Sequence, residues 1–119
     1  MKEKVMAAAV QMDIALFDEA ANLAYMESAI KKAKEEKNAD LVVFPELCSI
    51  GYIRERNKEF GHKYVMGAEK VPGEFTEALG EMAKKYDVYI ISGMTEAHPQ
   101  IPATLYNSAV LVDPMGKVA

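Results

Sequence analysis

A single carboxylate, Glu46, stands where the sequence predicts that a buried strand ends. The unbroken apolar run at residues 41–44 indicates a strand covered on both faces, and Pro45 cannot donate a hydrogen bond to a sheet, so we expect the strand to end there. Open α/β sheets place their ligand sites outside such strand ends. A carboxylate in apolar surroundings, between Phe44 and Leu47, holds a proton readily, which suits a general base. A solvated loop carboxylate or a cap on a following turn is the alternative.

Cys48, the only cysteine, lies two residues beyond Glu46. Side chains at that spacing on an extended segment point the same way, so a contact between the thiol and the carboxylate is one interpretation. No histidine or lysine stands nearby in the sequence to activate the thiol, and a lone cysteine is more often a small buried hydrophobe. We therefore interpret Cys48 as core packing, with a nucleophile as the alternative.

The other polar candidates give weaker signals. His62 and His98 stand far apart, without acidic or cysteine partners at ligand spacing, so no metal site is expected. The chain has no Gly-x-Gly-x-x-Gly motif and no phosphate loop ending in Gly-Lys-Ser/Thr, so no nucleotide cofactor is expected either. Asn107 either holds backbone groups near the site or is a structural hydrogen-bonding residue beside a strand.

The spacing of the apolar residues predicts the strands and helices that position these residues. Strands are predicted within residues 5–12, 41–44, 88–94 and 105–112, and helices within 19–37 and 75–86. Asn38 is expected to end the first helix, and Glu27 to pair with Lys31 on its exposed side. The polar stretch 54–70 is long for a loop, so it carries a short helix or lies over a site as a lid. This order predicts a layered α/β fold.

Composition limits the classes of function. The 119 residues include 14 Lys and Arg against 18 Asp and Glu, a formal charge of −4 without a basic cluster, so we expect neither nucleic acid nor an anionic membrane as a partner. No apolar run is long enough to span a bilayer, and no signal-peptide core follows the first residues. A single cysteine excludes an internal disulfide, which favours a reducing, cytoplasmic setting.

Several motifs resemble those of the nitrilase, or carbon–nitrogen hydrolase, superfamily, and they occur in the family's order. They are Ala9-Val10-Gln11-Met12, the helix with Asn22, residues 40–47 with Gly51-Tyr52, Ile91-Ser92-Gly93, residues 105–109 and residues 113–116. The resemblance implies an αββα sandwich and hydrolysis or transfer at a non-peptide C–N bond of a small amide, nitrile or carbamoyl substrate. It also implies a Glu–Lys–Cys triad, in which Glu46 is the general base, the cysteine forms a thioester and the lysine stabilises the tetrahedral intermediate.

The lysine and cysteine of that triad have no counterpart in this sequence. The resemblance puts both beyond the Asp-Pro-Met-Gly turn at 113–116, and Lys117 follows that turn too closely to be the lysine, so we interpret it as a solvated charge. The turn and the three residues after it form half a hairpin. We therefore interpret residues 1–119 as the amino-terminal portion of a single carbon–nitrogen hydrolase domain, an αββα sandwich truncated after about four strands, and expect no turnover from it alone.

A non-catalytic role is the alternative interpretation. A fragment or pseudoenzyme acts through self-association or by pairing with a segment that supplies the missing part. A sheet that stops after its fourth strand leaves an unpaired edge and uncovered apolar surface, and both favour association. Members of the family commonly form homodimers, so the resemblance also implies a homo-oligomer.

Overall fold

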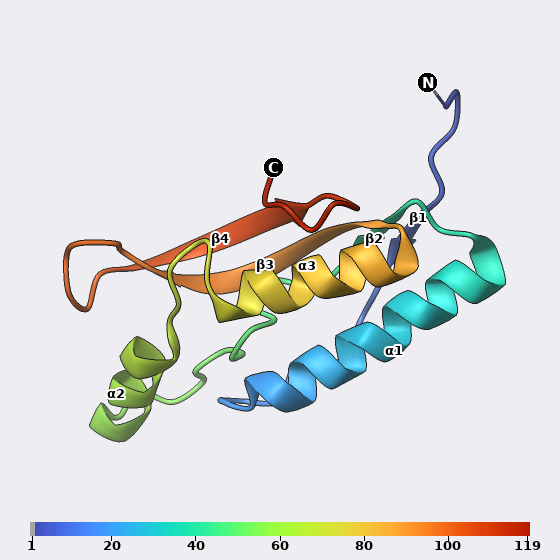
Figure 1. The fold of residues 1–119 in the computed structure, drawn as a ribbon. Coiled ribbons are helices and arrows are strands. Elements are labelled where there is room, and N and C mark those ends of the chain that lie inside the picture. Colours follow the sequence, from blue (N-terminus) through green and yellow to red (C-terminus); the bar gives the residue numbers. More distant parts are fainter. Residues whose placement is uncertain (1) are drawn as a thin grey trace.

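The structure, a computed structural model, describes residues 2–119. This part of the chain forms three helices and four strands (Figure 1). In chain order they are β1 (Ala7–Ala9), α1 (Glu19–Lys37), β2 (Leu41–Val43), α2 (Lys58–Gly67), α3 (Glu74–Tyr86), β3 (Tyr89–Ala97) and β4 (Leu105–Val112). The predicted α/β fold is confirmed, and α1 and β4 have the predicted bounds. The stretch 54–70 carries a short helix, α2, which was one of its two interpretations.

The strands form one mixed sheet in the order β1-β2-β3-β4. The first three strands are parallel, and β4 returns antiparallel to β3. After β4 the Gly116 N–H donates to the Asp113 carbonyl at 2.8 Å and closes a tight turn, which leads into a bridge between Val118 and Val112. The predicted turn and the start of a returning strand are both confirmed.

The helices α1 and α3 lie against each other on one face of the sheet (Figure 1). Between them and the strands lies the hydrophobic core, which includes Met26, Ile30, Phe75, Leu79, Met82, Val42, Ile90, Met94, Val110 and Val112. The prediction that residues 41–44 are covered on both faces is wrong within this chain. Val42 is fully buried, but Leu41 and Val43 are only half-buried because both long helices lie on the other side of the sheet.

Neither α1 nor α3 covers the opposite side of the sheet, which we call the open face. Alternation along the strands gives this face a mostly apolar set of residues: Leu41, Val43, Tyr89, Ile91, Ala109 and Leu111, with Asn107 at one end. Tyr89 is 46% exposed and Leu111 37% exposed. The described residues therefore supply one helix layer and one sheet layer of the expected αββα sandwich.

Local capping explains the bounds of α1. Asp18 accepts a hydrogen bond of 3.0 Å from a backbone N–H three residues later, and Asn38 ends the helix in the left-handed conformation, φ 49°, as predicted. The predicted pair of Glu27 with Lys31 is not a direct ion pair, although, together with the hydrogen bond from Lys85, the Lys31 charge helps to lower the pKa of Glu27. Glu27 instead accepts a hydrogen bond of 2.7 Å from Lys85 of α3, because the two helices pack side by side.

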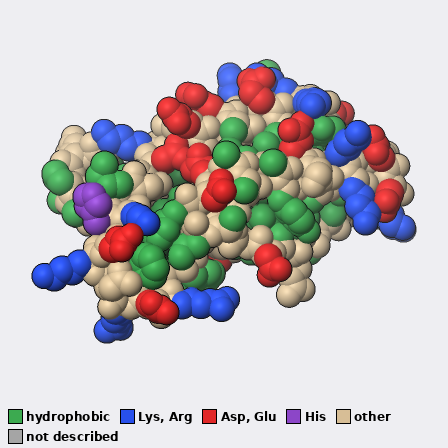
Figure 2. Space-filling model, turned by 90° about the horizontal axis from the view of Figure 1, so that it is seen from below, with side chains coloured by type: hydrophobic (Ala, Val, Ile, Leu, Met, Phe, Trp, Pro, Cys, Tyr) green, Lys and Arg blue, Asp and Glu red, His purple; other side chains and the backbone are tan. Residues whose placement is uncertain are grey.

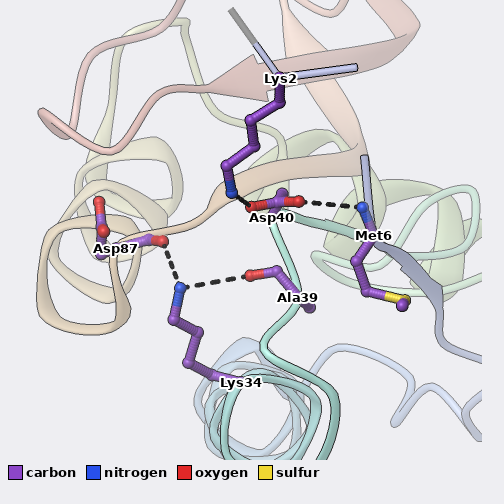
Figure 3. A network of polar contacts seen from close by, with 6 residues as sticks. All are labelled: Lys2, Met6, Lys34, Ala39, Asp40 and Asp87. Atoms are coloured by element: carbon purple, nitrogen blue, oxygen red, sulfur yellow. Dashed lines mark hydrogen bonds and ion pairs between the residues drawn. The ribbon is translucent and has the colours of Figure 1, made fainter. Parts of the chain in front are cut away.

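A polar network ties the amino ends of the parallel strands to the helix ends (Figure 3). The Lys34 ammonium at the end of α1 donates to the carbonyl oxygens of Ala39, at 3.4 Å, and Asp87, at 3.1 Å. The Asp40 carboxylate accepts a hydrogen bond of 2.9 Å from the Met6 N–H. The segments leading into β1, β2 and β3 are thus held together by charged groups bonded to backbone.

Candidate active site

The segment that carries Glu46 stays attached to β3 after β2 has ended. The Gly93 N–H donates to the Pro45 carbonyl at 3.2 Å, and the Gly93 carbonyl accepts from the Cys48 N–H at 3.0 Å. Between these two bonds the chain turns, with Leu47 in the left-handed conformation at φ 52°. Two bonds to one strand residue fix the start and the end of the turn, and Glu46 projects from between them.

Gly93 makes this path possible because it has no side chain. A Cβ atom there would lie 2.6 Å from the Glu46 Cα, 2.6 Å from the Leu47 nitrogen and 2.8 Å from the Pro45 oxygen. All three are backbone atoms, which cannot rotate away as a side chain can. Our sequence reasoning did not single out Gly93 as a site residue, although a glycine inside a strand often marks such a close backbone approach.

Asn107 of β4 reaches Glu46 across β3. In the register of the two strands Asn107 is opposite Thr95 and Ala109 is opposite Gly93, so the asparagine is the diagonal neighbour of the glycine on the open face. The Asn107 Nδ2 donates a hydrogen bond to the Glu46 Oε1. Position 93 carries no side chain and position 109 only a methyl group. The sequence left the role of Asn107 open, and its observed partner is the candidate base.

The Glu46 side chain is exposed, and the expectation of apolar surroundings is therefore wrong within this chain. Its neighbours Phe44 and Leu47 are 5% and 8% exposed, so they are buried as expected. The turn directs those two side chains inward and Glu46 outward, where it meets Asn107. Among the described residues only one carboxylate oxygen, Oε1, has a protein donor, and Oε2 is open to a ligand.

Cys48 lies in the core on the helix side of the sheet. Its side chain is fully buried, and its Sγ is 4.0 Å from the Met12 sulfur. Burial raises the pKa of the Cys48 thiol to about 11, although a hydrogen bond with Ser92 acts in the opposite direction. The interpretation as core packing is confirmed. The idea that Cys48 and Glu46 point the same way is wrong, because the segment turns between them.

A cleft of about 660 Å³ adjoins the turn. Its walls come from the loop at 11–16, from Pro45 and Tyr52, and from Phe60 of α2, while Arg54 and Glu55 bring charges of both signs. Phe60 is held in place by Phe17, with ring centroids 5.9 Å apart. The cleft thus begins one residue before Glu46, which is not part of its lining.

The histidines and carboxylates of the described chain form no metal site. Within residues 2–119, no group of three or more His, Cys, Asp or Glu side chains could hold a metal ion. The His98 Nδ1 accepts hydrogen bonds of 3.0 Å and 2.9 Å from two backbone N–H groups of its own turn. No described helix has both the length and the apolar character needed to cross a membrane. On the face shown in Figure 2, acidic and basic side chains are interspersed.

Comparison with known sequences gives a consistent result. A family model described as "Carbon-nitrogen hydrolase" matches residues 6–119. A nitrilase of Pyrococcus abyssi is 38% identical over 113 residues, which are 94% of this chain and 40% of that protein. An omega-amidase of Xenopus tropicalis is 34% identical over 94 residues, which are 76% of this chain and 30% of that protein. The chain therefore spans less than half the length of these curated relatives.

Comparison with solved structures concerns the fold. The crystal structure of an N-terminal amidase with a Gln-Gly peptide superimposes with a TM-score of 0.77 at 21% identity, covering 97% of this chain and 26% of that one. A superfamily protein of Xanthomonas campestris, with an arsenic adduct in its active site, gives a TM-score of 0.77 at 17% identity, covering 97% and 38%. The helix and sheet layers described above thus correspond to a portion of these larger folds.

Proposed function

Because this chain belongs to the carbon–nitrogen hydrolase family, we propose that it is part of an enzyme that hydrolyses non-peptide C–N bonds of small amides, nitriles or carbamoyl compounds. One observation carries the proposal: Glu46 presents its carboxylate at the carboxyl end of β2, with Asn107 bonded to one oxygen and the other oxygen open. A carboxylate in this position can repeatedly take up and release a proton. We assign Glu46 the role of general base.

The proposed reaction needs a thiol other than Cys48. Glu46 takes the proton of a cysteine thiol, the sulfur bonds to the carbonyl carbon of the amide, and the proton passes to the nitrogen as the C–N bond breaks. Glu46 then takes a proton from water, whose oxygen attacks the thioester, and the proton returns to the departing sulfur. Cys48 is buried on the other side of the sheet with a pKa of about 11, so another segment provides the nucleophile and a lysine for the tetrahedral intermediate.

Turnover measurements test the role of Glu46. The 119-residue chain alone is expected to hydrolyse no simple amide, nitrile or ureido acid, because the covalent route lacks its nucleophile. In the product of the complete reading frame, Glu46→Gln is expected to lower kcat by about 10²- to 10⁴-fold, the usual contribution of a positioned base. Glu36→Gln, which removes an exposed carboxylate from α1, is the matched control and should keep full turnover. Full activity of Glu46→Gln contradicts the proposal.

Association is a second candidate function, and the apolar open face favours it. We propose that this face is covered by a second copy of the chain or by a segment that supplies a second sheet layer, since Tyr89 and Leu111 are 46% and 37% exposed. Light scattering at micromolar concentration should detect a dimer or a larger species. Leu111→Lys should weaken the association, while Met66→Lys, at a 71% exposed position of α2, should not. A monomeric wild-type chain contradicts cover by a second copy.

A further inference from the structure

We infer that Asn107 is a positioning residue for Glu46, which fixes one carboxylate oxygen and leaves the other to exchange protons. The inference rests on the proposed function, because it concerns the same base. Its geometric support is the hydrogen bond from the Asn107 Nδ2 to the Glu46 Oε1, which joins β4 to the turn after β2. Since Oε1 is occupied on the β4 side, proton transfer falls to Oε2.

The chemistry of an amide suits this task. An asparagine NH2 group can only donate hydrogen bonds, so it recognises a carboxylate oxygen and carries no charge of its own. A lysine at position 107 would pair with the glutamate as an ion and compete for its charge, and an aspartate would repel it. Asn107 therefore orients Glu46 while leaving its negative charge available for the incoming proton.

The backbone sets the position of the amide. Asn107 is paired in the ladder with Thr95, and the Thr95 N–H donates to the Ser49 Oγ at 3.2 Å, so the same strand pair also holds the far side of the turn that carries Glu46. Asparagine has only two side-chain torsions, and its amide is thus placed by the β3–β4 register. Gly93, diagonally opposite, lets the backbone at Glu46 approach β3 closely, because a Cβ at Gly93 would lie 2.6 Å from the Glu46 Cα.

The contact can be tested in the 119-residue chain, with no need for turnover. In the ¹⁵N-labelled chain, the side-chain NH2 resonances of Asn107 should shift with pH as Glu46 takes up a proton, and this response should vanish in Glu46→Gln. The Asn57 amide, whose oxygen caps α2 by accepting from the Phe60 N–H at 2.8 Å, is the internal reference and should respond in neither chain. An Asn107 response that is the same in both chains overturns the inference.

The catalytic consequence is tested in the active product of the complete reading frame. Asn107→Asp keeps the shape of the side chain but replaces the donor by an acceptor, whereas Asn107→Ala only removes the donor. A structural role predicts that Asp is tolerated better than Ala. Positioning predicts the reverse near neutral pH, with kcat lower by up to about 10²-fold in Asn107→Asp, KM nearly unchanged, and partial recovery on acidification as the new carboxyl gains a donor proton.

The outcomes separate this inference from the proposed function. If Glu46→Gln abolishes turnover while both Asn107 variants keep it, the base stands and the positioning role is overturned. If Glu46→Gln keeps full turnover, the base itself is wrong and the positioning role is overturned with it. Greater loss in Asn107→Asp than in Asn107→Ala, with urea midpoints of the two variants close together, supports positioning.

Discussion

The two ends of the sheet use charged side chains in different ways. At the amino ends of the parallel strands, Lys34 and Asp40 bond to backbone groups of other segments, so each charge fastens two parts of the chain (Figure 3). At the carboxyl ends, Glu46 receives a hydrogen bond only on its Oε1, from Asn107, and remains exposed. Polar groups that are fully used for cohesion are unavailable for a ligand. This difference supports our proposal that the chemistry takes place at the carboxyl end.

The helix termini reinforce this contrast. The first turns of α1 and α3 carry acidic residues, among them Glu19 and Glu74, and their last turns carry lysines, among them Lys34 and Lys84. Carboxylates are favourable near helix amino termini and lysines near carboxyl termini, because of the partial charges of the unpaired backbone groups. Both helices run in the same sense against the sheet (Figure 1), so the acidic first turns of α1 and α3 lie at the same end of the layer.

Gly93→Ala should break the carboxyl-end arrangement, and we expect the largest effect from it. The added Cβ meets backbone atoms of the turn at 2.6 Å, so the turn or the strand must move. Overpacking of this kind usually costs about 1–3 kcal/mol, and occasionally more. Urea unfolding should show the lower free energy of unfolding, and the Asn107 side-chain resonances should lose their dependence on Glu46.

Gly61→Ala is the matched control for that variant. A Cβ at Gly61, within α2, meets nothing within 4 Å, so the substitution should stabilise the chain by about 0.5–1 kcal/mol through helix propensity. If the two alanine variants are equally stable, the close approach of the turn to Gly93 does not constrain the fold.

The helices and strands could be predicted because their signals are local. The apolar spacing of α1 and its stop at Asn38 lie within one segment of the chain, and the bounds of α1 were predicted correctly. The partners of polar side chains could not be predicted in this way. Glu27 bonds to Lys85, 58 residues away, and Glu46 to Asn107, 61 residues away, because helix packing and strand register bring them together.

The candidate site, too, could be predicted only where its signals are local. The position of Glu46 after a strand and a proline was readable from local sequence, whereas its exposure was not. Burial of Phe44 and Leu47 followed from their apolar side chains, but the left-handed turn at Leu47 that sends Glu46 outward has no local marker such as a glycine. Sequence pattern thus located the carboxylate, and only the turn geometry shows which way it points.

The second prediction concerns the pH dependence of stability at the first turn of α1. Burial raises the pKa of Glu19 from 4.5 to about 8, with a hydrogen bond and repulsion from Glu69 and repulsion from Glu74 adding to it. The folded chain therefore keeps a proton that the unfolded chain releases above pH 4.5, so the stabilising contribution of this carboxyl is complete below 4.5 and is lost as the pH rises through about 8. Glu19→Gln cannot ionise and should remove this decline.

Urea midpoints measured from about pH 5 to about pH 9 check this sign. The difference between Glu19→Gln and the wild-type chain should grow in favour of the variant as the pH rises. Glu36→Gln, at an exposed position of the same helix, should follow the wild-type curve. Parallel curves for Glu19→Gln and wild type would show that Glu19 does not hold the extra proton.

Lys34→Met should have the smallest effect, and it acts at the opposite end. It keeps the apolar stem but removes the ammonium group that bonds to the carbonyls of Ala39 and Asp87. The expected loss is about 1 kcal/mol in the free energy of unfolding, the usual net value of a hydrogen bond. Lys32→Met, at an exposed position of the same helix, should stay within about 0.5 kcal/mol of wild type.

The same variant tests whether the two ends are independent. β2 has three residues, which corresponds to about 10 Å of extended chain. At about this separation the effects of two mutations on the free energy of unfolding usually become additive. If fastening and chemistry are separate tasks, Lys34→Met lowers stability while the pH response of the Asn107 resonances stays as in the wild-type chain. Loss of that response would show that the amino-end network also holds the carboxyl-end turn in place, because so short a strand transmits the strain from one end to the other.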